Sequence, residues 1–228
     1  MLAFRSFLAI VRWDFVLELR RREAVLNMSL FAVLMLFIAS YGLSSRSELA
    51  PEVGPLFLWI TILFAGTVGL SRAFALERSA GALSGVLVSP LDPGVFYLAK
   101  VAATWLYVMA MELLVTAAYV ILFNFNRWER LPSLLATMAA FTLAYVGAGT
   151  VIAAMTTSLR GGEVVLRILL FPIMIPMVLI VIRAAEAVFP DEPPAGAPGL
   201  AMTLGKILPL ALIYISLGFI LFPRVVEE

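Results

Sequence analysis

The sequence predicts an all-α polytopic membrane protein with six transmembrane helices. The chain has 228 residues, of which 63% are hydrophobic and only 14% are charged. A soluble domain is about 45–50% apolar and about 25% charged. The apolar residues form six runs, and each run is long enough for a helix that crosses a hydrocarbon core of about 30 Å. Residues 1–228 are therefore expected to form a single transmembrane domain.

An amphipathic helix is expected before the first span, over residues 1–23. One stripe at helical spacing consists of Phe4, Leu8, Val11, Phe15 and Leu19. The other side is partly apolar too, so we expect this helix to lie along the inner membrane interface, with lipid on one side and protein on the other. The segment is too charged for the apolar region of a signal peptide.

The six spans are predicted at about residues 24–42, 55–75, 93–123, 132–157, 164–189 and 200–222. Asp92 is expected to cap the third span, because Pro93 follows it at the first helical position. Close helix contacts are expected at glycines of the second and fourth spans, namely Gly66, Gly69, Gly147 and Gly149. Pro172 and Pro176 are expected to break or kink the fifth span. Residues 190–199, PDEPPAGAPG, are predicted to form a loop.

The distribution of lysine and arginine predicts the orientation. With the N-terminus inside, eleven of the sixteen basic residues lie on the cytosolic side and five on the outer side. The positive-inside rule then places both termini in the cytosol. The connections at residues 77–92 and 158–163 also fall on the cytosolic side.

The connection Glu77–Lys100, ERSAGALSGVLVSPLDPGVFYLAK, is unusually polar for this chain. Leu83, Val86, Leu87 and Pro90 recur at helical spacing, and Pro90 ends the helix and favours an extended Ser89. The pattern predicts a short cytosolic helix between spans two and three. By pattern alone, a plain interfacial loop that joins two spans is the alternative.

Several motifs carry a family resemblance. Glu77-Arg78, Gly81-Ala82-Leu83, Ser89-Pro90-Leu91 and Ala99-Lys100 are similar to the cytosolic coupling segment of ABC-2-type exporter permeases. Leu159-Arg160-Gly161-Gly162, followed by Leu169-Leu170-Phe171-Pro172-Ile173-Met174-Ile175-Pro176, resembles the CcmB family of haem exporter permease subunits in cytochrome c maturation.

This resemblance implies a membrane permease subunit in the cytoplasmic (inner) membrane that couples ATP hydrolysis in a separate chain to haem handling or to release of a haem-loaded chaperone. The implied partners are a CcmA-like ATPase, CcmC-like and CcmD-like membrane subunits and a second permease copy. The implied ATPase-coupling residues are Glu77, Arg78, Gly81, Leu83, Leu87, Ser89 and Pro90, and a second cytosolic turn is formed by Arg160, Gly161 and Gly162.

The residue types present argue against chemistry within this chain. Cysteine and histidine are both absent, which excludes thiol catalysis, a Ser/His/Asp triad, cysteine-based metal sites and the commonest haem ligand. No Walker A motif or basic patch with interleaved aromatics is present. We therefore expect a non-catalytic subunit without a metal site, a cofactor of its own or a nucleic-acid partner. ATP would be bound by the partner, and haem would belong to the complex.

Glu112 is the one acidic residue well inside a predicted span. An intramembrane carboxylate is either functional or a neutral group that is hydrogen-bonded to a facing helix, and both alternatives stay open here. In the second case we expect Glu112 to donate to a neighbouring helix or to a second copy. Met174 and Met177 are expected to serve packing rather than haem ligation.

Three other functions remain open at this point. An ABC-2 exporter permease for a lipid, a glycan or a drug would share the motifs of the coupling segment. A non-transporting scaffold for haem-handling subunits would share the span pattern. A secondary transporter would need several intramembrane charges and an internal repeat, and neither is visible.

Overall fold

The computed structural model describes residues 2–21, 23–72, 74, 92–156, 159, 161–190 and 192–227. Their helices are α1 (Leu2–Arg21), α2 (Glu23–Leu43), α3 (Ala50–Arg72), α6 (Pro93–Leu122), α7 (Leu131–Thr156), α8 (Gly162–Val188) and α9 (Leu200–Glu227), with short 3-10 turns η1 (Ser44–Leu49) and η2 (Trp128–Arg130). No strand occurs within these ranges. All helices except α1 and the two 3-10 turns form candidate membrane spans, six in total. The predicted all-α fold with six spans is confirmed.

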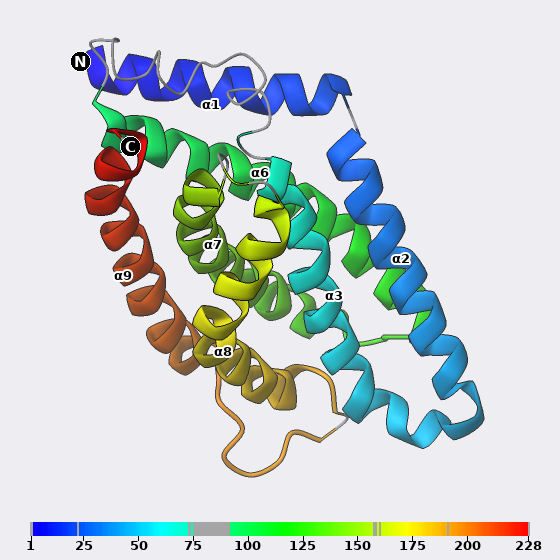
Figure 1. Ribbon diagram of the computed structural model, residues 1–228. Coiled ribbons are helices and arrows are strands. Elements are labelled where there is room, and N and C mark those ends of the chain that lie inside the picture. The colour runs from blue at the N-terminus through cyan, green and yellow to red at the C-terminus, as the bar shows by residue number, and fades with distance from the viewer. Residues whose placement is uncertain are drawn as a thin grey trace.

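Helix α1 lies across the upper end of the bundle, and α2 descends from it (Figure 1). The N- and C-termini lie at this same upper end, as an even number of crossings requires. The loop between α8 and α9 and the turn between α2 and α3 lie at the lower end. The upper end of the bundle thus carries α1 and both termini, and the lower end carries the α2–α3 and α8–α9 connections.

Helix α1 has exposed and half-buried apolar residues on both sides. Of the predicted stripe, Leu8 is exposed, whereas Val11 and Phe15 are half-buried. On the other side, Trp13 is exposed and Ile10 packs against the hydrophobic core. Helix α1 packs against α6 and also contacts α2. A helix that packs against protein and also exposes apolar residues agrees with the expected arrangement, and its position at the membrane interface stays a prediction.

Helix α7 is the centre of the bundle, with contacts to α9, α8, α6 and α3. It is also the most buried span, whereas α9 and α2 are the least buried. Gly147 packs against Ile215 of α9, and Gly149 packs against Leu70 of α3. A Cβ atom at Gly66 of α3 would lie 2.8 Å from Cε1 of Tyr145. The predicted close contacts at these glycines are confirmed.

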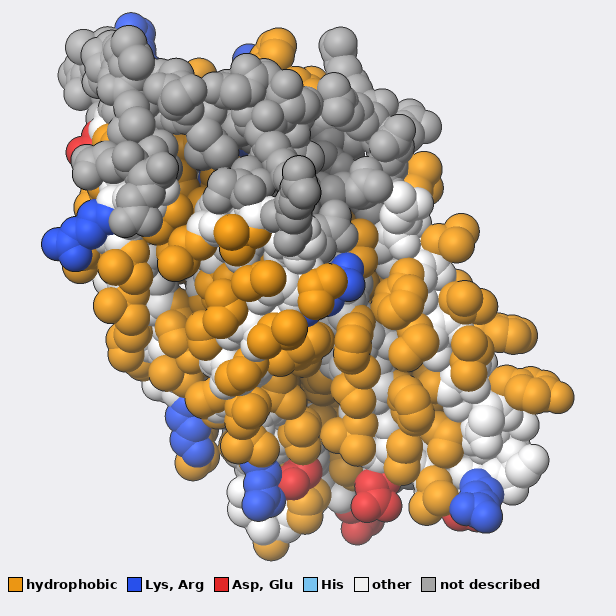
Figure 2. Space-filling view, in the orientation of Figure 1, with side chains coloured by type: hydrophobic (Ala, Val, Ile, Leu, Met, Phe, Trp, Pro, Cys, Tyr) orange, Lys and Arg blue, Asp and Glu red, His pale blue; other side chains and the backbone are white. Residues whose placement is uncertain are grey.

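Hydrophobic side chains cover the middle of the molecule, and charged ones gather at its lower end (Figure 2). Most of the exposed large apolar residues lie on α2, α8 and α9. Because a lipid-facing surface must be apolar, this band agrees with a chain that spans a membrane.

One predicted boundary differs from the structure, and one expected break is not seen. Helix α3 begins at Ala50 rather than Pro55, so Glu52 lies in its first turn and Pro55 inside the helix. A proline near the start of a helix, such as Pro55, removes at most one backbone hydrogen bond of that helix. Helix α8 runs unbroken from Gly162 to Val188 with Pro172 and Pro176 inside it, which agrees with the single span predicted over residues 164–189 but not with a break at the prolines. Between the two prolines, the carbonyl of Ile173 accepts a hydrogen bond of 2.9 Å from the Tyr214 hydroxyl of α9.

Candidate functional site

The predicted ATPase-coupling residues Glu77, Arg78, Gly81, Leu83, Leu87, Ser89 and Pro90 lie outside the described residues, and so does Arg160. Their roles therefore stay predictions. The structure does describe the residues that flank the coupling segment, Phe74 before it and Asp92 after it.

Asp92 fixes the start of α6. Its side-chain Oδ1 accepts hydrogen bonds from the backbone N–H groups of Gly94, at 2.7 Å, and Val95, at 3.4 Å. Its backbone is extended, and Pro93 follows at the first helical position. A carboxylate here satisfies amide donors that have no partner within the helix. The predicted N-cap at Asp92 is confirmed.

A buried ion pair joins α1 to α6. Nζ of Lys100 lies 2.8 Å from Oδ2 of Asp14, and the two side chains are only 4% and 16% exposed. The same Nζ lies 5.7 Å from the ring centroid of Phe74 and 5.6 Å from that of Phe96. A desolvated ammonium is stabilised both by a carboxylate and by the faces of aromatic rings.

Phe222 of α9 completes this cluster. Its ring lies 6.1 Å from that of Phe74, in a stacked arrangement, and 6.0 Å from that of Phe96. We call Asp14, Phe74, Phe96, Lys100 and Phe222 the α1–α6 anchor. It draws residues from three helices, and Phe74 lies at one end of the coupling segment.

Sequence reasoning missed the anchor. The motif Ala99-Lys100 was read as part of the family resemblance, and no partner was predicted for Lys100. The signal was present, however: Lys100 is the only charged residue besides Glu112 in the 30 residues of α6. A cation in such a helix needs a partner.

The glycines of the second connection serve its backbone geometry. Gly161 has φ +76°, a left-handed conformation that favours glycine. A Cβ atom on Gly162 would collide with the carbonyl oxygen of Thr156 at the end of α7. The turn is held by hydrogen bonds from Leu159 N to Thr156 O, 3.1 Å, and from Gly162 N to Leu159 O, 3.2 Å. Both glycines are thus explained by the tight α7–α8 turn, and a contact with an ATPase stays a prediction.

Glu112 is completely buried in α6. Its Oε1 accepts a hydrogen bond from the hydroxyl of Thr142 on α7. Its other carboxyl oxygen, Oε2, is buried without a hydrogen-bond partner among the described residues. The expected bond to a facing helix is confirmed, but Thr142 is the donor where Glu112 was expected to donate.

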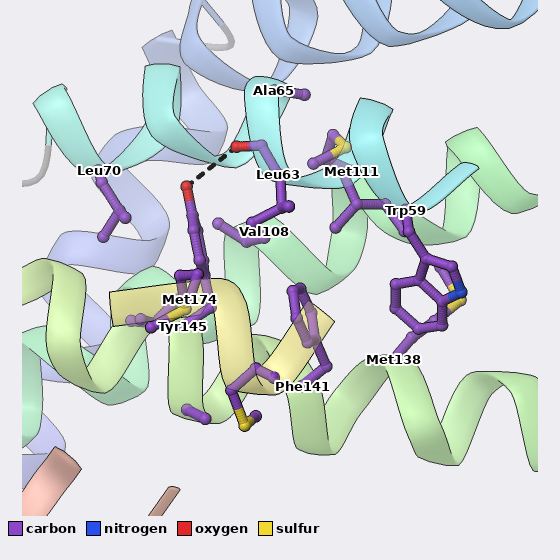
Figure 3. Close-up of a cluster of buried hydrophobic side chains, with 14 of the residues drawn as sticks. Trp59, Leu63, Ala65, Leu70, Val108, Met111, Met138, Phe141, Tyr145 and Met174 are labelled. Atoms are coloured by element: carbon purple, nitrogen blue, oxygen red, sulfur yellow. Dashed lines mark hydrogen bonds between the residues drawn. The ribbon is translucent and has the colours of Figure 1, made fainter. Parts of the chain in front are cut away.

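The apolar core beside this contact joins α3, α6, α7 and α8. Figure 3 shows Trp59, Met111, Met138, Phe141, Tyr145 and Met174 within it. The Tyr145 hydroxyl donates to the carbonyl of Leu63 at 3.1 Å, and the rings of Trp59 and Phe141 meet edge to face at 5.3 Å. Met174 and Met177 are buried in this core, which agrees with the packing role expected for them.

Comparison with known proteins places these features in a family. Residues 5–213 match the family described as "CcmB protein". The chain is similar to "Heme exporter protein B" of Bradyrhizobium diazoefficiens, with 25% identity over 190 residues that cover 83% of this chain and 85% of the relative. The protein of the same name from Pseudomonas aeruginosa is 25% identical over 206 residues, covering 87% and 92%. That from Escherichia coli is 25% identical over 204 residues, covering 89% and 90%. The chain therefore belongs to the CcmB protein family.

Proposed function

We propose that this chain is the membrane permease subunit of an ABC transporter that serves haem handling in cytochrome c maturation. The observation that carries the proposal is the family match over residues 5–213, which includes five complete spans and part of the sixth. Relatives that span nearly the whole chain bear the name "Heme exporter protein B". Haem, or a haem-loaded chaperone, is thus the proposed cargo of the complex.

The subunit itself is non-catalytic in this proposal. ATP is hydrolysed by a separate CcmA-like chain, and CcmC-like and CcmD-like subunits, with a second copy of this permease, complete the assembly. The protein lies in the cytoplasmic (inner) membrane with both termini in the cytosol. Support for this orientation comes from the lysine and arginine count and from the two termini lying at one end of the bundle (Figure 1).

The α1–α6 anchor gives the proposal a mechanical element. The segment between Phe74 and Asp92 is the proposed contact for the ATPase. Phe74 is held against Lys100 and Phe222, and Asp92 begins the helix that carries Lys100. A displacement of the segment would therefore act on α6 and α9 and, through the Lys100–Asp14 pair, on α1. Because packed cores are not continuously deformable, such a movement would shift whole helices.

The experiment is to replace Leu83 and Leu87 together with Asp. If the helix docks in a groove of the ATPase by its apolar face, the double variant should insert normally but lose stimulation of the ATPase and production of c-type cytochromes. A charge-matched control carries Asp at Ser45 and Ala195, which are exposed at the opposite end. Full ATPase stimulation and full cytochrome c production by the Leu83/Leu87 variant would show that this segment is not the coupling element.

A further inference from the structure

The lower ends of α8 and α9 enclose a groove that the proposed function does not use. It has a volume of about 140 Å³ and is lined by Leu179, Ile180, Arg183, Pro198, Thr203 and Lys206. Arg183 precedes the end of α8 at Val188, and Lys206 follows the start of α9 at Leu200. Each cation thus lies about one and a half turns inside its helix. Two neighbouring spans bring a positive charge to the same groove.

Among the described residues, the positive charges in this groove are only partly balanced. Arg183 pairs with Glu186 at 3.2 Å, and both side chains are exposed, at 76% and 38%. Lys206 is exposed and has no ion-pair or hydrogen-bond partner among the described residues. Both charged side chains that line the groove, Arg183 and Lys206, are therefore cations. Thr203 adds a buried side chain to the wall of the groove.

An apolar surface continues from the groove along both helices. Ile175 and Leu179 on α8 are 57% and 60% exposed, and Leu212 on α9 is 67% exposed. Figure 2 shows basic side chains at the lower end of the molecule next to this hydrophobic surface. The groove is large enough for a headgroup but not for acyl chains, which would lie against the exposed faces of α8 and α9.

We propose that this groove binds an anionic phospholipid, with its phosphate between Arg183 and Lys206 and its acyl chains along α8 and α9. Basic pockets between membrane helices hold lipid headgroups by charge, and each Lys or Arg near the membrane surface contributes about a fivefold gain in affinity. The lipid phosphate supplies the anionic partner that Lys206 does not have among the described residues. It also covers the apolar surface that a free phosphate ion would leave bare.

The test uses the full chain in neutral detergent with added phosphatidylglycerol or phosphatidylcholine. Lipid retained by the protein is measured by native mass spectrometry, and thermal stabilisation is measured in parallel. The wild type should retain phosphatidylglycerol in preference to phosphatidylcholine. The double variant Arg183→Gln/Lys206→Gln should bind phosphatidylglycerol about 25-fold more weakly, the product of two fivefold losses. Both side chains are exposed, so the variant should fold.

The matched control is Arg46→Gln, which removes an exposed cation that does not line the groove. It should leave phosphatidylglycerol retention unchanged. Equal retention by the double variant and the wild type would overturn the proposal. If inorganic phosphate displaced phosphatidylglycerol and stabilised the protein equally well, the groove would be a simple anion site and the assignment to a lipid would be wrong.

Discussion

The ion pair between Asp14 and Lys100 yields the sharpest prediction about what holds α1 in place. The perturbation is a set of three variants: Asp14→Asn, Lys100→Met and the two combined. Either single change leaves one charge buried without its partner, whereas the double change removes both charges. If the pair fixes α1 on α6, the three variants will not behave additively.

The structure sets the expected size of the change in the free energy of unfolding. At 2.8 Å and an effective dielectric constant of about 20, the gross attraction is about 6 kcal/mol. Desolvation of the two ions offsets most of it, but removing one partner of a buried pair typically costs about 3–5 kcal/mol. Asp14→Asn should lie within that range, because the Lys100 side chain that loses this carboxylate is only 4% exposed. The double variant should lie within about 1 kcal/mol of the wild type, because no buried charge remains.

The assay is the free energy of unfolding in neutral detergent, together with amide hydrogen exchange. In the single variants, exchange should rise first in α1 and at the start of α6, the two helices that the pair joins. The control is Arg183→Gln, which breaks an exposed pair and should change stability by at most about 1 kcal/mol. Two single effects below 1 kcal/mol that simply add in the double variant would refute the reasoning.

Two further predictions concern the membrane interior and the topology. Replacing Glu112 with Leu should weaken helix packing by about 1 kcal/mol, the scale of polar contacts between membrane helices, and Thr142→Val should cost the same without adding to it, because one bond is lost in each case. Glu112→Gln should be mild, so a Gln variant that lacks maturation activity while its stability stays normal would indicate a substrate-facing role for the carboxylate. A cysteine at Ala195, which is exposed in the loop before α9, should react with an impermeant reagent from outside the cell, and reaction only from the cytosol would overturn the orientation.

The spans and their start signals were predictable because their physics is local. A run of apolar residues must be helical in lipid, since no water satisfies its backbone, and Asp92-Pro93 encodes a helix start within two residues. One span across Pro172 and Pro176 was predicted as well, but whether the prolines break or kink that span was not predictable in this way, because their effect depends on the neighbouring helices.

The α1–α6 anchor could not be predicted from the sequence, because it depends on contacts between distant residues. Periodicity assigned α1 a stripe through Leu8, which is exposed, because an amphipathic pattern does not say which apolar side meets protein and which meets lipid. The ion pair between Asp14 and Lys100 joins residues that lie 86 positions apart in the sequence. A hydrogen bond from Glu112 to a facing helix was predicted. Its partner, Thr142 of α7, was not, because nothing in the sequence distinguishes it from the other threonines of that helix.

The measurement that tests the central claim most directly is covalently bound haem in c-type cytochromes of cells that lack this chain. The account predicts that covalent haem is lost, that b-type cytochromes keep their haem, and that the wild-type chain restores the c-type signal. It also predicts that the Leu83→Asp/Leu87→Asp variant inserts in the membrane but fails to restore that signal. Undiminished covalent haem in cells without the chain, accompanied by a defect in export of a lipid, a glycan or a drug, would contradict the account.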